Sequence, residues 1–102
     1  MTSSSSFGSQ AKLLAALANE KRLQILTIIM EKETGVNELA SRVGLSQSAL
    51  SQHLAKLRAD ELVTTRRDAQ NVYYSSNHES VRKILELLIA IETASASTRR
   101  YG

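Results

Sequence analysis

The feature that most constrains this fold is a very short gap between two amphipathic segments near the middle of the chain. Leu39, Ala40 and Val43 form an apolar stripe that stops at Gly44, and the next helical pattern starts at Ser46. Glycine readily ends a helix in the left-handed conformation, and serine is a preferred N-cap. The spacing therefore predicts two helices joined by a tight glycine-containing turn.

The hydrophobic spacing on either side of this turn predicts the rest of the fold. Apolar residues recur at helical intervals before and after it, and two runs rich in β-branched and aromatic residues flank a polar stretch at 68–71. We expect a mainly α (α+β) chain, a winged helix-turn-helix of about five helices plus a two-stranded β-hairpin wing. The expected helices cover about 10–18, 20–33, 36–43, 47–58 and 77–92, and the hairpin covers 62–75.

Local signals mark the starts of several of these helices. Asn19 is placed as the N-cap of the second helix, and Gly35 opens the third. Ser76 and Glu79 form the S-x-x-E pattern of a capping box, which predicts that Ser76 caps the last helix. The last helix carries a wider apolar arc than one core can cover, so its second side needs a partner.

Length and composition narrow the class of protein. A chain of 102 residues is one domain with a small core, which a second copy of the chain can enlarge. We expect a disordered Ser-rich tail at 1–9, a folded domain at 10–94 and a flexible basic tail at 95–102. Cysteine is absent, which excludes disulfides, thiolate metal sites and thiol redox switches. No signal-peptide pattern or bilayer-spanning apolar run is present, so we expect a soluble cytoplasmic protein.

The fourth helix has a polar side that carries almost no charge. Amide and hydroxyl side chains of this kind bond to base edges in the major groove of DNA, whereas a solvated helix face more often carries Glu and Lys. We therefore interpret this side as a base-reading surface. Ser46 at the helix N-terminus can approach a phosphate, and Lys56 adds a positive charge further along. The base-reading set consists of Gln47, Ser48, Ser51 and Gln52.

The hairpin that follows is basic near its tip. Arg66, Arg67 and Gln70 are placed to contact phosphates or the adjacent minor groove, although a hairpin with ordinary surface charges is the alternative. The net charge of +3 permits a nucleic-acid partner without requiring one. Of Tyr73 and Tyr74, one is expected to pack inward and the other to point outward.

Residues 11–91 resemble the ArsR/SmtB family of winged-helix repressors. The segments that carry the resemblance are LANEKRLQIL at 17–26, VNELASRVGLSQSALSQHLAKLRADELV at 36–63 and TRRDAQNVYY at 65–74. The resemblance implies a homodimer built from the first and last helices, a palindromic operator in double-stranded DNA, and repression of transcription. The recognition helix and the R-R-D-A-Q wing further resemble NolR-type regulators of rhizobia, which implies control of nodulation and related symbiosis genes.

Carried onto this chain, the resemblance assigns the base-reading and wing positions named above, with a phosphate contact open to His53. The alternative is that His53 is partly buried and makes only a structural hydrogen bond. On the first and last helices, the implied dimer interface consists of Leu13, Leu14, Leu17, Leu85, Leu88 and Ile89.

Departures from the family pattern bear on regulation and on the wing. The sensor cysteines of many members are missing, and the last helix lacks the second histidine of a dimer-bridging zinc site, so we expect no metal and no cofactor. His78 is expected at the surface. Many relatives have glycine at the wing tip, where this chain has Ala69. Because alanine resists positive φ, we expect a different type of turn there.

Three other functions compete with that of a DNA-binding regulator. The same fold can serve as a protein-interaction module. A ligand-responsive repressor with an unidentified effector also fits the residues. An enzyme has little support, because the chain shows no nucleophile–base pairing, glycine-rich phosphate loop or clustered carboxylate pair.

Overall fold

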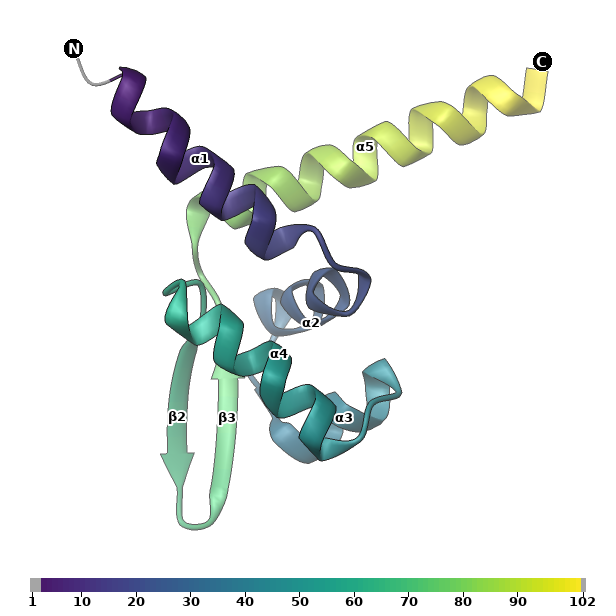
Figure 1. Cartoon of the computed structure of the whole chain (residues 1–102). Helices are drawn as coiled ribbons and strands as arrows, with labels where there is room; N and C mark the ends of the chain where they lie inside the picture. The colour runs from purple at the N-terminus through teal and green to yellow at the C-terminus, as the bar shows by residue number, and fades with distance from the viewer. Residues whose placement is uncertain (1–2, 102) are drawn as a thin grey trace.

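The computed structural model describes the backbone of residues 3–101 and the side chains of residues 6–95. Figure 1 shows a body formed by the central helices, a hairpin that projects from it, and the first and last helices diverging at the opposite end. The expected winged helix-turn-helix architecture is confirmed over residues 3–101. Its elements are α1 (Ser3–Leu17), α2 (Glu20–Glu31), β1 (Thr34–Gly35), α3 (Val36–Val43), α4 (Gln47–Ala59), β2 (Thr64–Asp68), β3 (Asn71–Ser75) and α5 (Glu79–Tyr101).

The core is centred on α2, as its wide apolar surface predicts. Ile25, Leu26 and Ile29 are all at most 1% exposed. Burial of each such side chain stabilises the fold by about 1.5–3 kcal/mol. The other elements contribute one inward-facing stripe each. These stripes include Leu17, Leu39, Val43, Leu50, Leu54, Leu57, Leu62, Tyr74, Val81 and Leu85.

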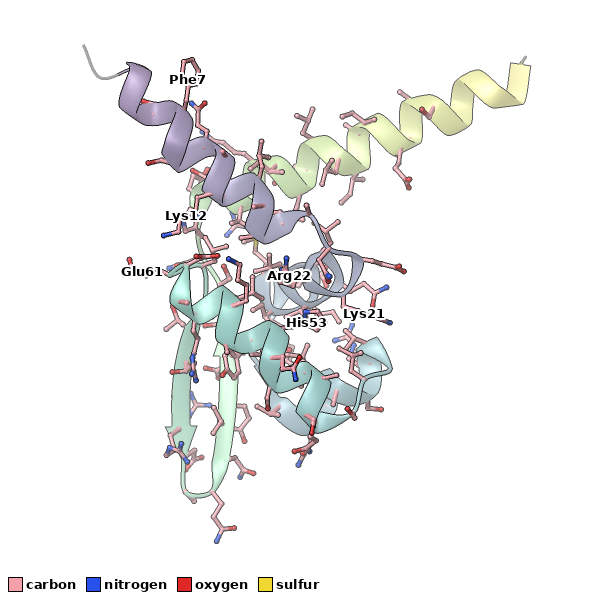
Figure 2. All side chains as sticks on the ribbon, in the orientation of Figure 1. Phe7, Lys12, Lys21, Arg22, His53 and Glu61 are labelled. Atoms are coloured by element: carbon pink, nitrogen blue, oxygen red, sulfur yellow. The ribbon has the colours of Figure 1, made fainter. Side chains whose placement is uncertain are left out.

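A charged side chain fixes the corner between α1 and α2. Asn19 caps α2 as expected, its Oδ1 accepting from the Arg22 amide at 3.0 Å. The Arg22 guanidinium turns back to α1, where Nε donates to the Ala16 carbonyl at 2.6 Å and Nη2 to the Ala15 carbonyl at 3.3 Å. Both carbonyls lie in the last turn of α1, where carbonyls lack an i+4 amide inside the helix; the Ala15 carbonyl also accepts from the Ala18 amide at 3.3 Å. Arg22 thus ends α1 and sets its direction at the junction seen in Figure 2.

The turn between α3 and α4 has the expected geometry. Gly44 adopts φ 70°, and the Leu45 amide donates to the Ala40 carbonyl at 3.0 Å, which is the bond that closes a Schellman motif. Ser46 then caps α4, its Oγ accepting from the Ala49 amide at 3.2 Å. From α2, Lys21 Nζ donates to the Val43 carbonyl at 2.7 Å and ties the end of α3 to the body.

The end of α4 repeats this motif without a glycine. The Leu62 amide donates to the Leu57 carbonyl at 3.0 Å, and the Glu61 amide donates to the Arg58 carbonyl at 2.9 Å. Glu61 therefore takes the left-handed position, with φ 60°. This conformation costs an L-residue roughly 1–2 kcal/mol, which glycine avoids.

A short strand that the sequence analysis missed extends the wing into a three-stranded sheet of order β1-β3-β2. The strands are antiparallel, and β1 pairs Thr34 with Tyr74 and Gly35 with Tyr73. Gly35 lies under the Tyr73 ring, where an added Cβ would stand 3.4 Å from the ring edge. The alternation expected of the two tyrosines is confirmed, since Tyr74 is buried and Tyr73 is half-buried.

Both end helices are longer than the sequence predicts. α1 begins at Ser3, so residues 3–9, expected to be disordered, are helical. α5 continues to Tyr101, through most of the expected flexible tail at 95–102. Residues 1, 2 and 102 lie outside the described part of the chain. Once a helix is nucleated, each further residue adds one hydrogen bond, so propagation overrides weak local propensity.

The start of α5 corrects one prediction: Ser76 does not cap this helix. The Ser76 hydroxyl is buried and donates to the Leu62 carbonyl at 2.7 Å, which commits it to the loop after α4. His78 caps the helix instead, with Nδ1 accepting from the Val81 amide at 3.3 Å. His78 was expected at the surface and is half-buried.

Candidate DNA-binding surface

The base-reading side of α4 is fully exposed on the described structure. Gln47, Ser48, Ser51 and Gln52 are all exposed, while Leu50, Leu54 and Leu57 anchor the opposite side in the core. Figure 1 shows α4 across the front of the body, with no other element over its outer side. The arrangement presents amides and hydroxyls on a rigid helix, as contact with base edges requires.

One member of this set has a partner that the sequence analysis did not identify. Gln47 Nε2 donates a hydrogen bond to Oδ1 of Asn37, which lies in the first turn of α3. The two residues are ten positions apart and belong to different helices, so no local pattern reveals the pairing.

His53 and Lys56 occupy less direct positions than the base-reading set. His53 is half-buried, and Figure 2 shows it on the side of α4 toward α2. Lys56 Nζ lies 3.3 Å from Asp60 Oδ2, in an i,i+4 ion pair, and Lys12 of α1 lies 4.0 Å from Oδ1. The Asp60 side chain is only 8% exposed, so Lys56 is held at the end of α4.

The wing tip corrects the expectation drawn from Ala69. β2 and β3 pair up to Asp68 and Asn71, which leaves Ala69 and Gln70 as a two-residue loop. Ala69 adopts φ 58°, the positive value that alanine was expected to avoid. Positive φ at the first loop residue alone is the pattern of a type II′ turn, one of the two that match the twist of a hairpin. The strand pairing therefore overrides the local preference of alanine.

Arg66 is held by groups of the protein itself. Its Nε and Nη2 donate to the two carboxylate oxygens of Glu33 at 3.0 and 2.8 Å, and its guanidinium lies 4.6 Å from the centre of the Tyr73 ring. The hydrogen bond from Arg66, above all, lowers the pKa of Glu33. The same bond raises the pKa of Arg66. This pairing joins the wing to the segment before β1.

Arg67 faces the other side of the hairpin. Neighbouring residues of a strand point to opposite faces, and Arg67 pairs with Val72 in the register. Its side chain is exposed, and within residues 6–95 it has no ion-pair or hydrogen-bond partner. Gln70 is exposed at the tip. Of the two wing arginines, Arg67 is therefore the one available to an external anion.

A groove of about 420 Å³ joins the start of α4 to the wing. Its walls come from the first turn of α3, the first residue of α4, and β3 with the wing tip. Side-chain amides dominate its polar lining, which includes Asn37, Gln47, Gln70 and Asn71. Through Gln47, the base-reading side thus borders the same groove as the wing tip.

An apolar surface lies at the opposite end of the molecule. Phe7 and Leu14 of α1 are 69% and 58% exposed, and Leu85 is the last buried residue of α5 within the described side chains. A second groove, of about 450 Å³, runs between α2 and α5 and is lined mainly by apolar side chains. The exposed apolar residues of α5 are Leu87, Leu88, Ile89 and Ile91.

Two members of the implied dimer interface are largely covered within the protomer. Leu17 and Leu85 are 3% and 8% exposed and pack in the core of the protomer itself. Leu13 is half-buried against the same core. The exposed members are Leu14, Leu88 and Ile89, and Leu87 and Ile91 join them although the sequence analysis did not name them.

The described part of the chain offers neither a metal cluster nor a membrane span. Its His, Asp and Glu side chains nowhere gather in a group of three that could hold a metal ion. None of its helices combines the length and the apolar character needed to cross a membrane.

Comparison with known proteins identifies the family. The family model described as bacterial regulatory protein, arsR family, matches residues 19–65, which run from the cap of α2 into β2. The nodulation protein NolR of Rhizobium meliloti is 60% identical over 78 residues, covering 76% of this chain and 64% of NolR. The transcriptional activator HlyU of Vibrio cholerae is 57% identical over 76 residues, covering 74% of this chain and 70% of HlyU. The chain belongs to the arsR family of bacterial regulatory proteins.

Solved structures agree with this assignment. The crystal structure of NolR from Sinorhizobium fredii superposes with a TM-score of 0.83 at 55% identity, covering 87% of this chain and 89% of that one. A homodimeric winged helix-turn-helix DNA-binding domain from Mycobacterium bovis superposes with a TM-score of 0.76 at 29% identity, covering 88% and 83%. Membership of the arsR family makes this protein a DNA-binding transcription regulator and not an enzyme. The matched segment spans just under two thirds of the R. meliloti NolR chain.

Proposed function

We propose that this arsR-family protein is a repressor that binds a palindromic operator in double-stranded DNA as a homodimer. The observation that carries the proposal is the exposed, polar and nearly uncharged side of α4, which through Gln47 borders the same groove as the wing tip. Gln47 and Gln52 supply the amides for base edges, and Ser48 and Ser51 supply hydroxyls. Arg67 supplies a phosphate contact, and Gln70 reaches toward the minor groove at the wing tip.

The apolar surface of α1 and α5 supports the dimer. Leu14, Leu88 and Ile89 are exposed large apolar side chains at the end of the molecule away from the wing. Pairing of two copies through this end buries that surface and leaves both α4 helices free. A twofold axis between them requires an operator with the same symmetry. The similar domain from M. bovis is homodimeric, which supports the same arrangement here.

The kinship with NolR supports a finer proposal about targets. This chain is 60% identical to NolR over 78 residues, and the genes that we propose it controls are nodulation and related symbiosis genes. The proposed place of action is the nucleoid in the cytoplasm. Repression follows if the dimer blocks access of the polymerase to the promoter. HlyU is named an activator, so transcription in vitro from a promoter that carries the selected site is the test that separates the two directions.

Selection from random duplexes tests DNA binding itself. The chain is expected to enrich an inverted repeat whose half-sites lie about 10 base pairs apart. Affinity for this site should fall steeply as salt rises, because phosphate contacts release counterions. A protein-interaction module would enrich no repeat and would show only weak, sequence-independent binding.

Substitution of Gln47 tests the base-reading side. Gln47→Ala is expected to cost about 1–3 kcal/mol on the selected site and to relax base choice at one position of each half-site. Asn77→Ala is the matched control, because Asn77 also carries an exposed amide but lies in the loop before α5. If Gln47→Ala discriminates between cognate and scrambled duplexes as well as Asn77→Ala does, Gln47 is not a reader.

A further inference from the structure

A hydrogen bond between two exposed side chains links α3 to α4 at the start of the base-reading surface. Asn37 lies in the first turn of α3, and its Oδ1 accepts from Gln47 Nε2. That turn is held firmly, because Gly35 pairs with Tyr73 in the sheet and Leu39 is fully buried. The backbone of Asn37 is therefore fixed relative to α4, while its exposed side-chain amide lines the groove that Gln47 also lines.

The hydrogen-bonding capacity of a glutamine amide decides what this bond does. The side chain has two N–H donors on Nε2 and an oxygen that accepts. Asn37 takes one donor, which leaves one N–H and Oε1. Recognition of adenine uses one donor and one acceptor, since the amide donates to N7 and accepts from N6. The pairing with Asn37 thus leaves free the two groups that a bidentate contact needs.

We infer that Asn37 is a positioning residue for base readout, which holds the Gln47 amide in the orientation that selects adenine in the operator. The inference rests on the proposed function. A free glutamine side chain loses rotamer freedom when it is ordered at an interface, and an amide already held by the protein loses less. Among the described members of the base-reading set, Gln47 is the one with such a side-chain partner. Because Asn37 holds the Gln47 amide, the orientation of that amide, and not only its presence, contributes to recognition of the base.

The test compares binding to two duplexes that differ only at the base pair whose specificity Gln47→Ala relaxes. Asn37→Leu keeps the approximate size of the side chain and removes the acceptor. We expect it to reduce discrimination between the two duplexes by about tenfold, the scale of one good bidentate contact. Asn37→Asp keeps an acceptor and is expected to retain the discrimination. Its added negative charge weakens binding to both duplexes alike, so the ratio of the two Kd values is unaffected.

Two controls separate positioning from a general structural effect. Ser41→Ala changes another exposed residue one turn further along α3 and is expected to leave the ratio unchanged. Asn37→Leu in a Gln47→Ala background is expected to add no further loss, because there is no amide left to orient. The inference would be overturned if Asn37→Asp lost discrimination between the two duplexes. It would also be overturned if adding Asn37→Leu to Gln47→Ala reduced discrimination as much as Asn37→Leu does alone.

A measurement on the free protein tests the inference without DNA. The Nε2 group of Gln47 is expected to show restricted motion by NMR relaxation in the parent and in Asn37→Asp, and to become mobile in Asn37→Leu. A mobile Gln47 amide in the parent overturns the inference even where the operator is bound with full specificity. Failure of the parent to enrich any duplex overturns the proposed function, and the role of Asn37 in readout falls with it.

Discussion

The guanidinium of Arg66 and the carboxylate of Glu33 are joined by two hydrogen bonds of 3.0 and 2.8 Å, from residues 33 positions apart. The pair ties β2 to the segment that leads into β1, and Tyr73 lies between the two strands against the same guanidinium. It changes the role expected of the wing arginines, because the charge of Arg66 is already matched within the protein.

The two wing arginines are therefore expected to differ in their effect on DNA binding. Arg67→Ala should weaken binding to all duplexes and reduce the slope of log K against log salt by about one unit, as loss of one phosphate contact does. Arg66→Ala should change that slope much less, since its charge is compensated by Glu33. Binding isotherms over a series of salt concentrations measure both. Equal changes in slope for the two variants would show that DNA draws Arg66 away from Glu33.

The pH dependence of the wing follows from the lowered pKa of Glu33, whose main cause is the hydrogen bond from Arg66. A depressed pKa means that the pairing stabilises the fold fully above the ordinary glutamate pKa, near 4.3, and loses this effect as the pH falls through the lowered value. Arg66→Gln is expected to raise the pKa of Glu33 toward that ordinary value. NMR titration of the side-chain carboxyl carbon measures it, with Arg67→Gln as the matched control. A Glu33 pKa unchanged by Arg66→Gln would contradict the stated cause.

If two copies pair through the exposed apolar side chains of α1 and α5, a charge introduced there should weaken the dimer. Leu88 is 40% exposed, so Leu88→Glu should be tolerated in a single protomer but should oppose pairing, where the carboxylate would lose its water. Sedimentation equilibrium is expected to show a shift from dimer to monomer. Thr64→Glu places the same charge on an exposed residue of the wing and should leave the dimer intact. An unchanged dimer in Leu88→Glu would move the interface away from this residue.

The two Schellman motifs provide a matched pair of stability predictions. Glu61 at φ 60° occupies the position that Gly44 occupies at φ 70°. Glu61→Gly should stabilise the fold by up to about 1 kcal/mol, because relief of left-handed strain outweighs the greater freedom of glycine in the unfolded chain. Gly44→Ala should destabilise it by about 1 kcal/mol from backbone strain alone, since an added Cβ would meet nothing within 4 Å. Midpoints of urea unfolding measure both changes, and a destabilised Glu61→Gly would contradict the strain argument.

Local signals in the sequence predicted the helices well. Asn19, Gly44 and Ser46 act within three or four residues of their own position, so their roles follow from the residues themselves. The buried side of α4 was predicted equally well, because Leu50, Leu54 and Leu57 recur at helical spacing.

Several of the missed features depend on partners distant in the sequence. The pairing of Gln47 with Asn37, and of Arg66 with Glu33, exists only once the helices and strands have packed. Ser76 fits a capping box in sequence, but the Leu62 carbonyl takes its hydroxyl in the folded chain. At the wing tip, the pairing of Asp68 with Asn71 leaves room for two residues only and forces Ala69 to positive φ. In each case tertiary structure settles a choice that local preference leaves open.

The apolar surface of α5 bears on how the amount of this regulator sets its activity. Beyond Leu85, α5 displays exposed apolar side chains from Leu87 to Ile91, a surface of the kind that binds another protein surface. If the proposed dimer is the form that binds DNA, its concentration rises with the square of the protomer concentration when copies are scarce. A modest change in synthesis would then become a larger change in operator occupancy.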